Sequence, residues 1–100
     1  MARGRHPETK AWAEFMHFKR RIWERYRIRV VREAYDVLCA RAAAASVILL
    51  QSNRMSVRRL FVDGRWILCL FDCVRGRLTT VLPPEVQEEE QIHDYVERRK

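Results

Sequence analysis

His17, Arg21 and Arg25 recur at every fourth position and would share one face of a helix. An imidazole beside guanidinium groups suits the cleavage of RNA through its 2′-hydroxyl, in which one group takes the hydroxyl proton and another protonates the leaving oxygen. Cations then stabilise the pentavalent phosphate. His17 and Glu24 would transfer the protons in such a reaction. Charged side chains opposite an apolar helical stripe are ordinarily just solvated, however, and this simpler explanation stays open.

This chemistry also needs hydrogen-bond donors and phosphate-binding cations from the rest of the chain. As a catalytic set we predict His17, Arg21, Glu24 and Thr80. As a nucleic-acid-binding set we predict Arg20, Arg25, Arg59, Arg77 and Thr79. The sequence contains no Gly-rich phosphate loop, nucleophile elbow or heptad array. The prediction therefore depends on residue types and spacing alone.

Three cysteines, Cys39, Cys69 and Cys73, lie within apolar runs or beside a turn rather than in a spaced framework. An odd number in these positions indicates reduced thiols in a cytoplasmic protein. Cys69 and Cys73 are four residues apart, but neither a second cysteine pair nor a nearby histidine completes a zinc site. We therefore predict no metal and no cofactor, so that any endoribonuclease activity would be metal-independent.

The 100 residues carry a formal net charge of +7, which is unevenly distributed. Residues 1–82 contain 17 basic and 7 acidic side chains, whereas residues 83–100 contain 3 basic and 6 acidic ones. A cationic body favours a nucleic acid, with RNA preferred to DNA, or an acidic protein partner. Arginine outnumbers lysine 17 to 3, which suits bidentate phosphate contacts, although GC-rich coding sequence produces the same bias. No apolar run reaches the length of a membrane span, so no membrane partner is expected.

Short apolar runs between residues 57 and 83 predict an antiparallel meander. Asp63-Gly64 is a strong hairpin signal, because a type I′ turn needs positive φ at both central positions. Arg75-Gly76 supplies a second turn. The predicted strands span about 57–62, 66–71 and 78–82, with a fourth over 46–51. The run WILCLF of the middle strand is apolar on both faces and must be central, and the run SVILLQ of the fourth strand should also be covered on both faces.

Aromatic side chains in these strands have two interpretations. Phe61, Trp66 and Phe71 could stack on nucleobases if one face of the sheet is exposed. Aromatic residues of a central strand are more often part of the core. Neither outer strand has a purely apolar face, so the pattern does not decide which side of the sheet the helices cover.

Two helices are predicted before the sheet. Apolar residues from Ala11 to Tyr26 recur at intervals of three and four, which indicates a helix from about Glu8 with Thr9 as its cap. A second helix should follow over about 31–44, after a short extended link within RIRVV. Residues 1–8 have no apolar period and predict a flexible basic arm.

A C-terminal helix is predicted over residues 85–100, where acids come first and bases last. It would dock by Ile92, Tyr95 and Val96, or fray. Its acids could also fold over the basic body and compete with an anionic ligand, in which case truncation after Pro84 would tighten nucleic-acid binding.

The chain is therefore predicted to be one α+β domain with its compact core over residues 9–84. It should contain two N-terminal helices, a four-stranded antiparallel sheet and a C-terminal helix.

This order of elements, with a histidine and repeated arginines on the first helix, resembles the RelE, barnase, EndoU and colicin superfamily of small bacterial and phage ribonuclease domains. The resemblance is carried by HFKRRIWERYRIRVVREAYDVL (residues 17–38) and GRWILCLFDCVRGRLTTVLPP (residues 64–84). It implies a twisted antiparallel sheet with helices on one face and a toxin that cleaves RNA, often on the ribosome. Carried over by position, it implicates His17, Arg21, Arg25 and Thr80.

Three functions stay open at the level of sequence. The first is a RelE-like toxin ribonuclease, or a relative that binds RNA without cleaving it. The second is a non-enzymatic inhibitor or regulator, such as a phage anti-defence protein, that binds a nucleic acid or a nucleic-acid-processing complex. The third is a subunit whose apolar edge pairs with itself to give a homodimer.

Overall fold

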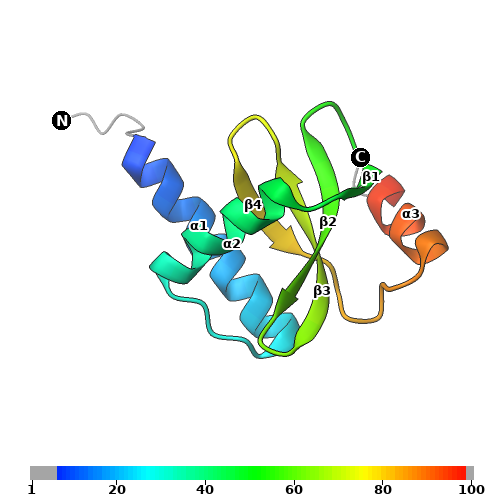
Figure 1. Cartoon of the computed structure of the whole chain (residues 1–100), viewed down its shortest axis with the longest axis horizontal. Helices are drawn as coiled ribbons and strands as arrows, with labels where there is room; N and C mark the ends of the chain where they lie inside the picture. Colours follow the sequence, from blue (N-terminus) through cyan, green and yellow to red (C-terminus); the bar gives the residue numbers. More distant parts are fainter. Residues whose placement is uncertain (1–6, 99–100) are drawn as a thin grey trace.

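The computed structural model describes residues 7–98, with side chains from Lys10 onward (Figure 1). The elements are α1 (Pro7–Tyr26), α2 (Arg32–Ala44), β1 (Val47–Leu50), β2 (Met55–Val62), β3 (Arg65–Asp72), β4 (Arg77–Val81) and α3 (Glu89–Arg98). This order confirms the predicted α+β fold of two helices, a four-stranded antiparallel sheet and a C-terminal helix. Within the described range, no helix is both long and apolar enough to cross a membrane.

The sheet has the strand order β1–β2–β3–β4, and all its pairs are antiparallel. β2 and β3 pair over their full lengths, ending with Val62 opposite Arg65. Between them, Asp63 and Gly64 have φ values of 52° and 82°, as the predicted type I′ turn requires. β3 lies between β2 and β4, which confirms that WILCLF is a central strand.

Helices cover both faces of this sheet (Figure 1). α1 and α2 cover one face and enclose a first core, to which β3 contributes Ile67, Cys69 and Phe71. α3 covers the other face and encloses a second core with Leu68 and Leu70 of the same strand. The C-terminal helix therefore docks rather than frays, and the core extends past residue 84. The arrangement also differs from the helices on one face that the family resemblance implied.

β1 differs from its prediction. Although SVILLQ is almost wholly apolar, Val47 and Leu50 are 46% and 64% exposed. β1 is the outer strand of the sheet and pairs only with β2. The expectation that both faces of this strand are covered was therefore wrong, because burial depends on the strand's place in the sheet as well as on its apolar residues.

The N-terminal boundary of α1 also differs from the sequence prediction. The helix begins at Pro7, so Thr9 lies within it and is not its cap. A proline fits the first turn of a helix because its missing N–H has no intrahelical partner there. Residues 1–6 of the predicted basic arm lie outside the described residues.

A bulge in β4 changes the simple alternation of its side chains. Leu70 pairs with Thr80 whereas Phe71 pairs with Leu78, so that Thr79 is the extra residue. Leu78 and Val81 consequently both enter the first core, although they are an odd number of residues apart. Both threonines of the predicted site therefore lie at an irregular part of the strand.

Candidate nucleic-acid interface

Two residues of α1, Glu14 and Arg25, join this helix to β4 and to the turn before it. The Glu14 carboxylate accepts hydrogen bonds from Arg75 just before the strand, one of them at 3.0 Å. Eleven residues later, Arg25 donates to the carbonyl oxygen of Val81, the last residue of the strand. His17 and Arg21 follow Glu14 at helical spacing, so they lie on the same side of α1, between these two contacts.

Burial is the largest cause of a lowered pKa at His17. The nearby charges of Arg21, Arg20 and Arg25 lower it further, in that order, whereas Glu24 raises it. The ordinary pKa of the imidazole is 6.5, so that a lowered pKa keeps His17 neutral at pH 7. A neutral imidazole can accept a proton, as the predicted general base requires.

Other predicted site residues are already hydrogen-bonded within the protein. Arg21 pairs with Glu24 at 3.0 Å, and Arg77 pairs with Asp36 at 3.1 Å. Arg25 also donates to the Tyr95 hydroxyl at 3.4 Å, which ties α1 to α3. The exposed pair of Arg21 and Glu24 can be exchanged for a phosphate at little cost, since exposed ion pairs contribute little stability.

The hydroxyl groups of the two threonines donate hydrogen bonds to nearby backbone carbonyl oxygens. Thr79 donates to Leu70 at 3.3 Å and Thr80 to Val81 at 3.5 Å. Among the residues that the structure describes, neither threonine is hydrogen-bonded to His17. The structure thus brings α1 and β4 together, but it does not assemble His17 and Thr80 into a hydrogen-bonded cluster.

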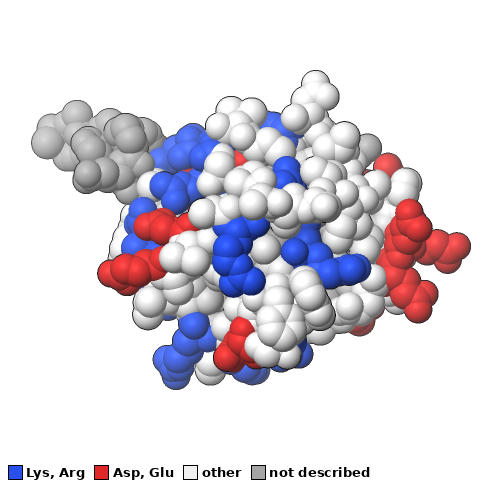
Figure 2. All heavy atoms as spheres, viewed as in Figure 1, with Lys and Arg blue, Asp and Glu red and all other residues white. Residues whose placement is uncertain are grey.

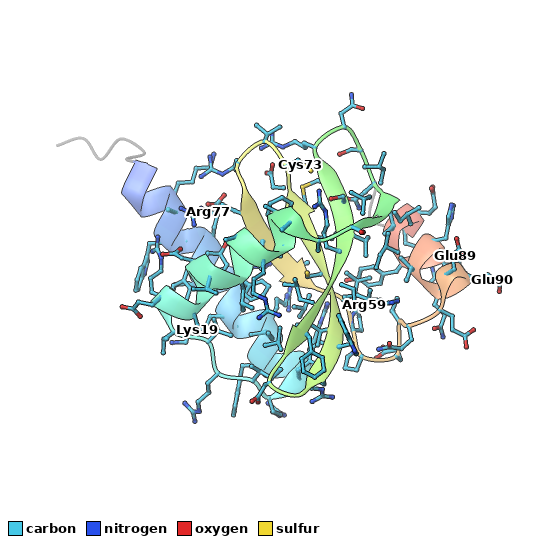
Figure 3. All side chains as sticks on the ribbon, viewed as in Figure 1. Lys19, Arg59, Cys73, Arg77, Glu89 and Glu90 are labelled. Carbon is cyan, nitrogen blue, oxygen red and sulfur yellow. The ribbon has the colours of Figure 1, made fainter. Side chains whose placement is uncertain are left out.

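Arg59 lies away from His17, whereas Arg20 is close enough to lower the pKa of His17 but lines a different surface. Arg59 pairs in the sheet with Leu68, a residue of the second core, so it faces the α3 side of the sheet (Figure 3). Arg20 lies in a hollow on α1 together with Trp23. The predicted binding set is therefore distributed over more than one surface.

Two adjoining hollows at the link between α1 and α2 form what we call the link groove. Their volumes are about 310 and 660 Å³, and both are lined by Trp23, Ile28 and Arg29. The charged and aromatic side chains that line the groove are Lys19, Arg20, Trp23, Arg27, Arg29, Arg41 and Asp63. Five cations and a single carboxylate thus line it within the described part of the chain.

The backbone of the link explains why these arginines point outward. Arg27 ends α1 with a left-handed φ of 58°, while its amide still donates to the Trp23 carbonyl at 2.9 Å. Ile28 and Val30 then enter the first core. The intervening Arg29 is exposed because side chains of an extended segment alternate in direction. Alternation within RIRVV was the sequence signal that Arg29 is exposed, but Arg20 alone of the predicted binding set lines this groove.

Two guanidinium groups lie close to the Trp23 ring system. The Arg27 and Arg29 guanidinium carbons are 5.4 and 4.9 Å from the centre of the Trp23 ring system. Trp23 is nevertheless 39% exposed. Part of its ring system therefore remains accessible to a ligand.

The five cations of the link groove have no carboxylate partner among the described residues. The ion pairs of that range involve other arginines, namely Arg21, Arg32, Arg54, Arg75 and Arg77. Arg41 is held instead by a 2.7 Å hydrogen bond to the Phe61 carbonyl oxygen. The groove thus combines uncompensated positive charge with an exposed aromatic ring.

Comparisons with known proteins add no assignment, since no family model, curated protein or solved structure matches the chain. Within the described residues, no group of three or more His, Cys, Asp or Glu side chains is placed to hold a metal ion. The geometry of the chain itself must therefore support any function proposed for it.

The state of His17 can be tested by NMR titration. We expect a pKa below 6.5, a rise on Arg21→Ala and a further fall on Glu24→Gln, because these side chains lower and raise the pKa respectively. The folded state disfavours the imidazolium, so stability present above pH 6.5 should decline as the pH falls through the lowered pKa. His17→Asn should remove that part of the decline.

A His17 pKa at or above 6.5, or one that neither variant moves, would contradict this electrostatic description.

Proposed function

We propose that this chain binds RNA through the link groove. The observation that carries the proposal is the partly exposed Trp23 beside two arginines that have no carboxylate partner in the described part of the chain. Guanidinium groups attract phosphates and release their condensed counterions, while an aromatic ring offers a surface on which a base can stack. Figure 2 shows acidic side chains at the α3 end of the face in view, and both basic and acidic side chains over the rest of it.

Binding can be measured by fluorescence anisotropy with a labelled single-stranded RNA. Trp23→Ala should weaken binding by about ten- to a hundredfold, because stacking on an aromatic ring contributes about 1–3 kcal/mol per base. Trp12→Ala is the matched control, since Trp12 lies on the same helix, is 51% exposed and does not line the groove. It should leave the affinity almost unchanged.

The dependence of the binding affinity on salt concentration and on the type of nucleic acid gives two further tests of the proposal. The affinity should fall steeply between low and moderate salt, and Arg29→Ala should make the slope shallower. The same oligonucleotide as DNA tests the preference for RNA. An affinity that is independent of salt, or equal losses in the two tryptophan variants, would count against the groove. Binding of neither nucleic acid would leave an acidic protein surface as the better partner for these cations.

A metal-independent, RelE-like endoribonuclease is the second candidate, supported by the lowered pKa of His17. In this proposal the neutral imidazole takes the proton of the RNA 2′-hydroxyl, whose oxygen bonds to phosphorus and gives a 2′,3′-cyclic phosphate. The P–O5′ bond breaks and the departing oxygen takes a proton from water, while Arg21, released from Glu24, stabilises the phosphate. RNA incubated with the protein should then be cleaved, and His17→Ala should abolish cleavage while RNA binding persists. Binding without cleavage would instead favour a non-enzymatic regulator.

A further inference from the structure

The sheet face under α3 is only partly covered. Val57 and Leu68 of this face belong to the second core. At its hairpin end, Phe61 and Trp66 face the same side, because each is separated from the core residue of its strand by an even number of positions. Their exposed fractions are 44% and 59%. Two large aromatic side chains thus lie beyond the part of the sheet that the second core covers.

Phe61 and Trp66 form a cross-strand pair. They are directly opposite each other in the ladder, with ring centroids 5.2 Å apart and planes inclined at 63°. Such a pair stabilises a hairpin modestly, which is the simplest reason for its presence. Hairpin stability alone does not account for the unpaired cation beside it.

That cation is Arg59, two residues before Phe61 on the same face of β2. Its side chain is exposed and makes no hydrogen bond or ion pair within the described residues (Figure 3). An aromatic surface beside an unpaired guanidinium matches a nucleotide, which presents a flat base and a charged phosphate. The same combination of an aromatic ring and a guanidinium group occurs in the link groove.

The two surfaces meet at the β2–β3 hairpin. Val62 and Asp63 line the link groove, and Phe61 precedes them on the other side of the sheet. Arg41 of the groove donates its hydrogen bond to the Phe61 carbonyl oxygen. A ligand that leaves the groove at this end therefore reaches the exposed aromatic pair directly.

We propose that Phe61 and Trp66 form a second base-stacking site, so that the ligand is a single strand running from the link groove around the hairpin onto the sheet. The inference rests on the proposed nucleic-acid binding at the groove and adds the class of ligand. A duplex does not satisfy both sites, because its bases are already stacked on one another and their faces are not accessible.

The test compares a Phe61→Ala/Trp66→Ala variant with the unchanged chain on strands of about 4 and about 12 nucleotides, within the range of single-strand site sizes. The longer strand should lose about tenfold or more in affinity, whereas the shorter strand, held by the groove, should lose little. Arg59→Ala should weaken the longer strand by a smaller factor without disturbing the hairpin packing. Leu50→Ala is the control, since Leu50 is exposed on the outer strand and lies outside both sites.

Each outcome separates the second site from the groove. If Trp23→Ala weakens the longer strand but the double variant and Arg59→Ala do not, the second site is wrong and the groove remains. If none of them weakens binding, both proposals fail. A duplex bound as tightly as the single strand overturns the inference. So does a dimer that the double variant dissociates without loss of strand binding, because the aromatic face would then join two copies.

Discussion

Arg58→Ala should lower the free energy of unfolding by about 2–4 kcal/mol, because it empties a buried position and removes a hydrogen-bond donor from the carbonyl oxygens at the C-terminus of α2. Arg58 is only 7% exposed. Its guanidinium donates to the carbonyl oxygens of Ala42 and Ala45 at 3.0 and 2.9 Å, and to the Ser56 hydroxyl at 2.9 Å. Arg58 therefore supplies hydrogen-bond donors to the C-terminus of a helix that lacks a glycine cap, and its positive charge complements the helix dipole.

The neighbouring arginine gives a matched control in urea unfolding. Arg59→Ala removes the same side chain one position later, where it is exposed, and should change the free energy of unfolding by about 0.5 kcal/mol or less. Arg58→Lys should fall between the two, because an ammonium group keeps the charge but cannot reproduce the planar fork. Equal losses for Arg58→Ala and Arg59→Ala would show that Arg58 does not support the end of α2.

Truncation after Pro84 should remove most of the stability of the domain. Val86, Ile92 and Val96 are at most 8% exposed and belong to the second core. Burial of a side chain of this size contributes about 1.5–3 kcal/mol, so losing all three costs about 5 kcal/mol or more, comparable to the lower range for whole domains. Near-ultraviolet circular dichroism and urea unfolding should show a loss of fixed packing.

Truncation does not test whether the acids of the C-terminal helix shield the basic body, because it also removes residues of the second core. Substitutions that keep the fold are needed for this hypothesis. Glu89 and Glu90 project outward from α3 (Figure 3), and Gln at both positions keeps the apolar side of the helix. We expect this double variant to unfold like the unchanged chain and to bind RNA within about twofold of its affinity at 0.15 M salt, where charges are screened beyond about 8 Å. A large gain in affinity would support the shielding hypothesis, and a cooperative transition in the truncated chain would contradict the role of α3 in the core.

Local chemistry was sufficient to predict most of the fold. The Asp63-Gly64 turn, the doubly apolar run of β3 and the helical spacing of Phe15, Phe18 and Ile22 depend only on near neighbours in the chain. Docking of the C-terminal helix by Ile92 and Val96 was one of two outcomes that the sequence allowed, and it occurs because the second face of β3 is also apolar.

The candidate site was harder to predict from the sequence, because the residue type does not show whether a charged side chain is solvated, ion-paired or buried. Arg58 and Arg59 are adjacent and identical in type, yet one supports a helix end inside the protein and the other is exposed on the sheet. Arg25, predicted to bind nucleic acid, is hydrogen-bonded to β4 and α3. Their environments are set by contacts between residues far apart in the sequence.

The sequence by itself determined the elements of this protein, their order and its cationic character, since turn geometry, apolar periodicity and charge are properties of the chain. Only the tertiary structure decided which of the basic side chains lie at a surface where a ligand can bind. Packing of the link against α1 and α2 leaves Trp23 beside Arg27 and Arg29 at a groove. Because the second core stops short of the hairpin, Phe61 and Trp66 remain exposed. Both outcomes follow from which surfaces meet in three dimensions, a long-range property that residue spacing does not contain.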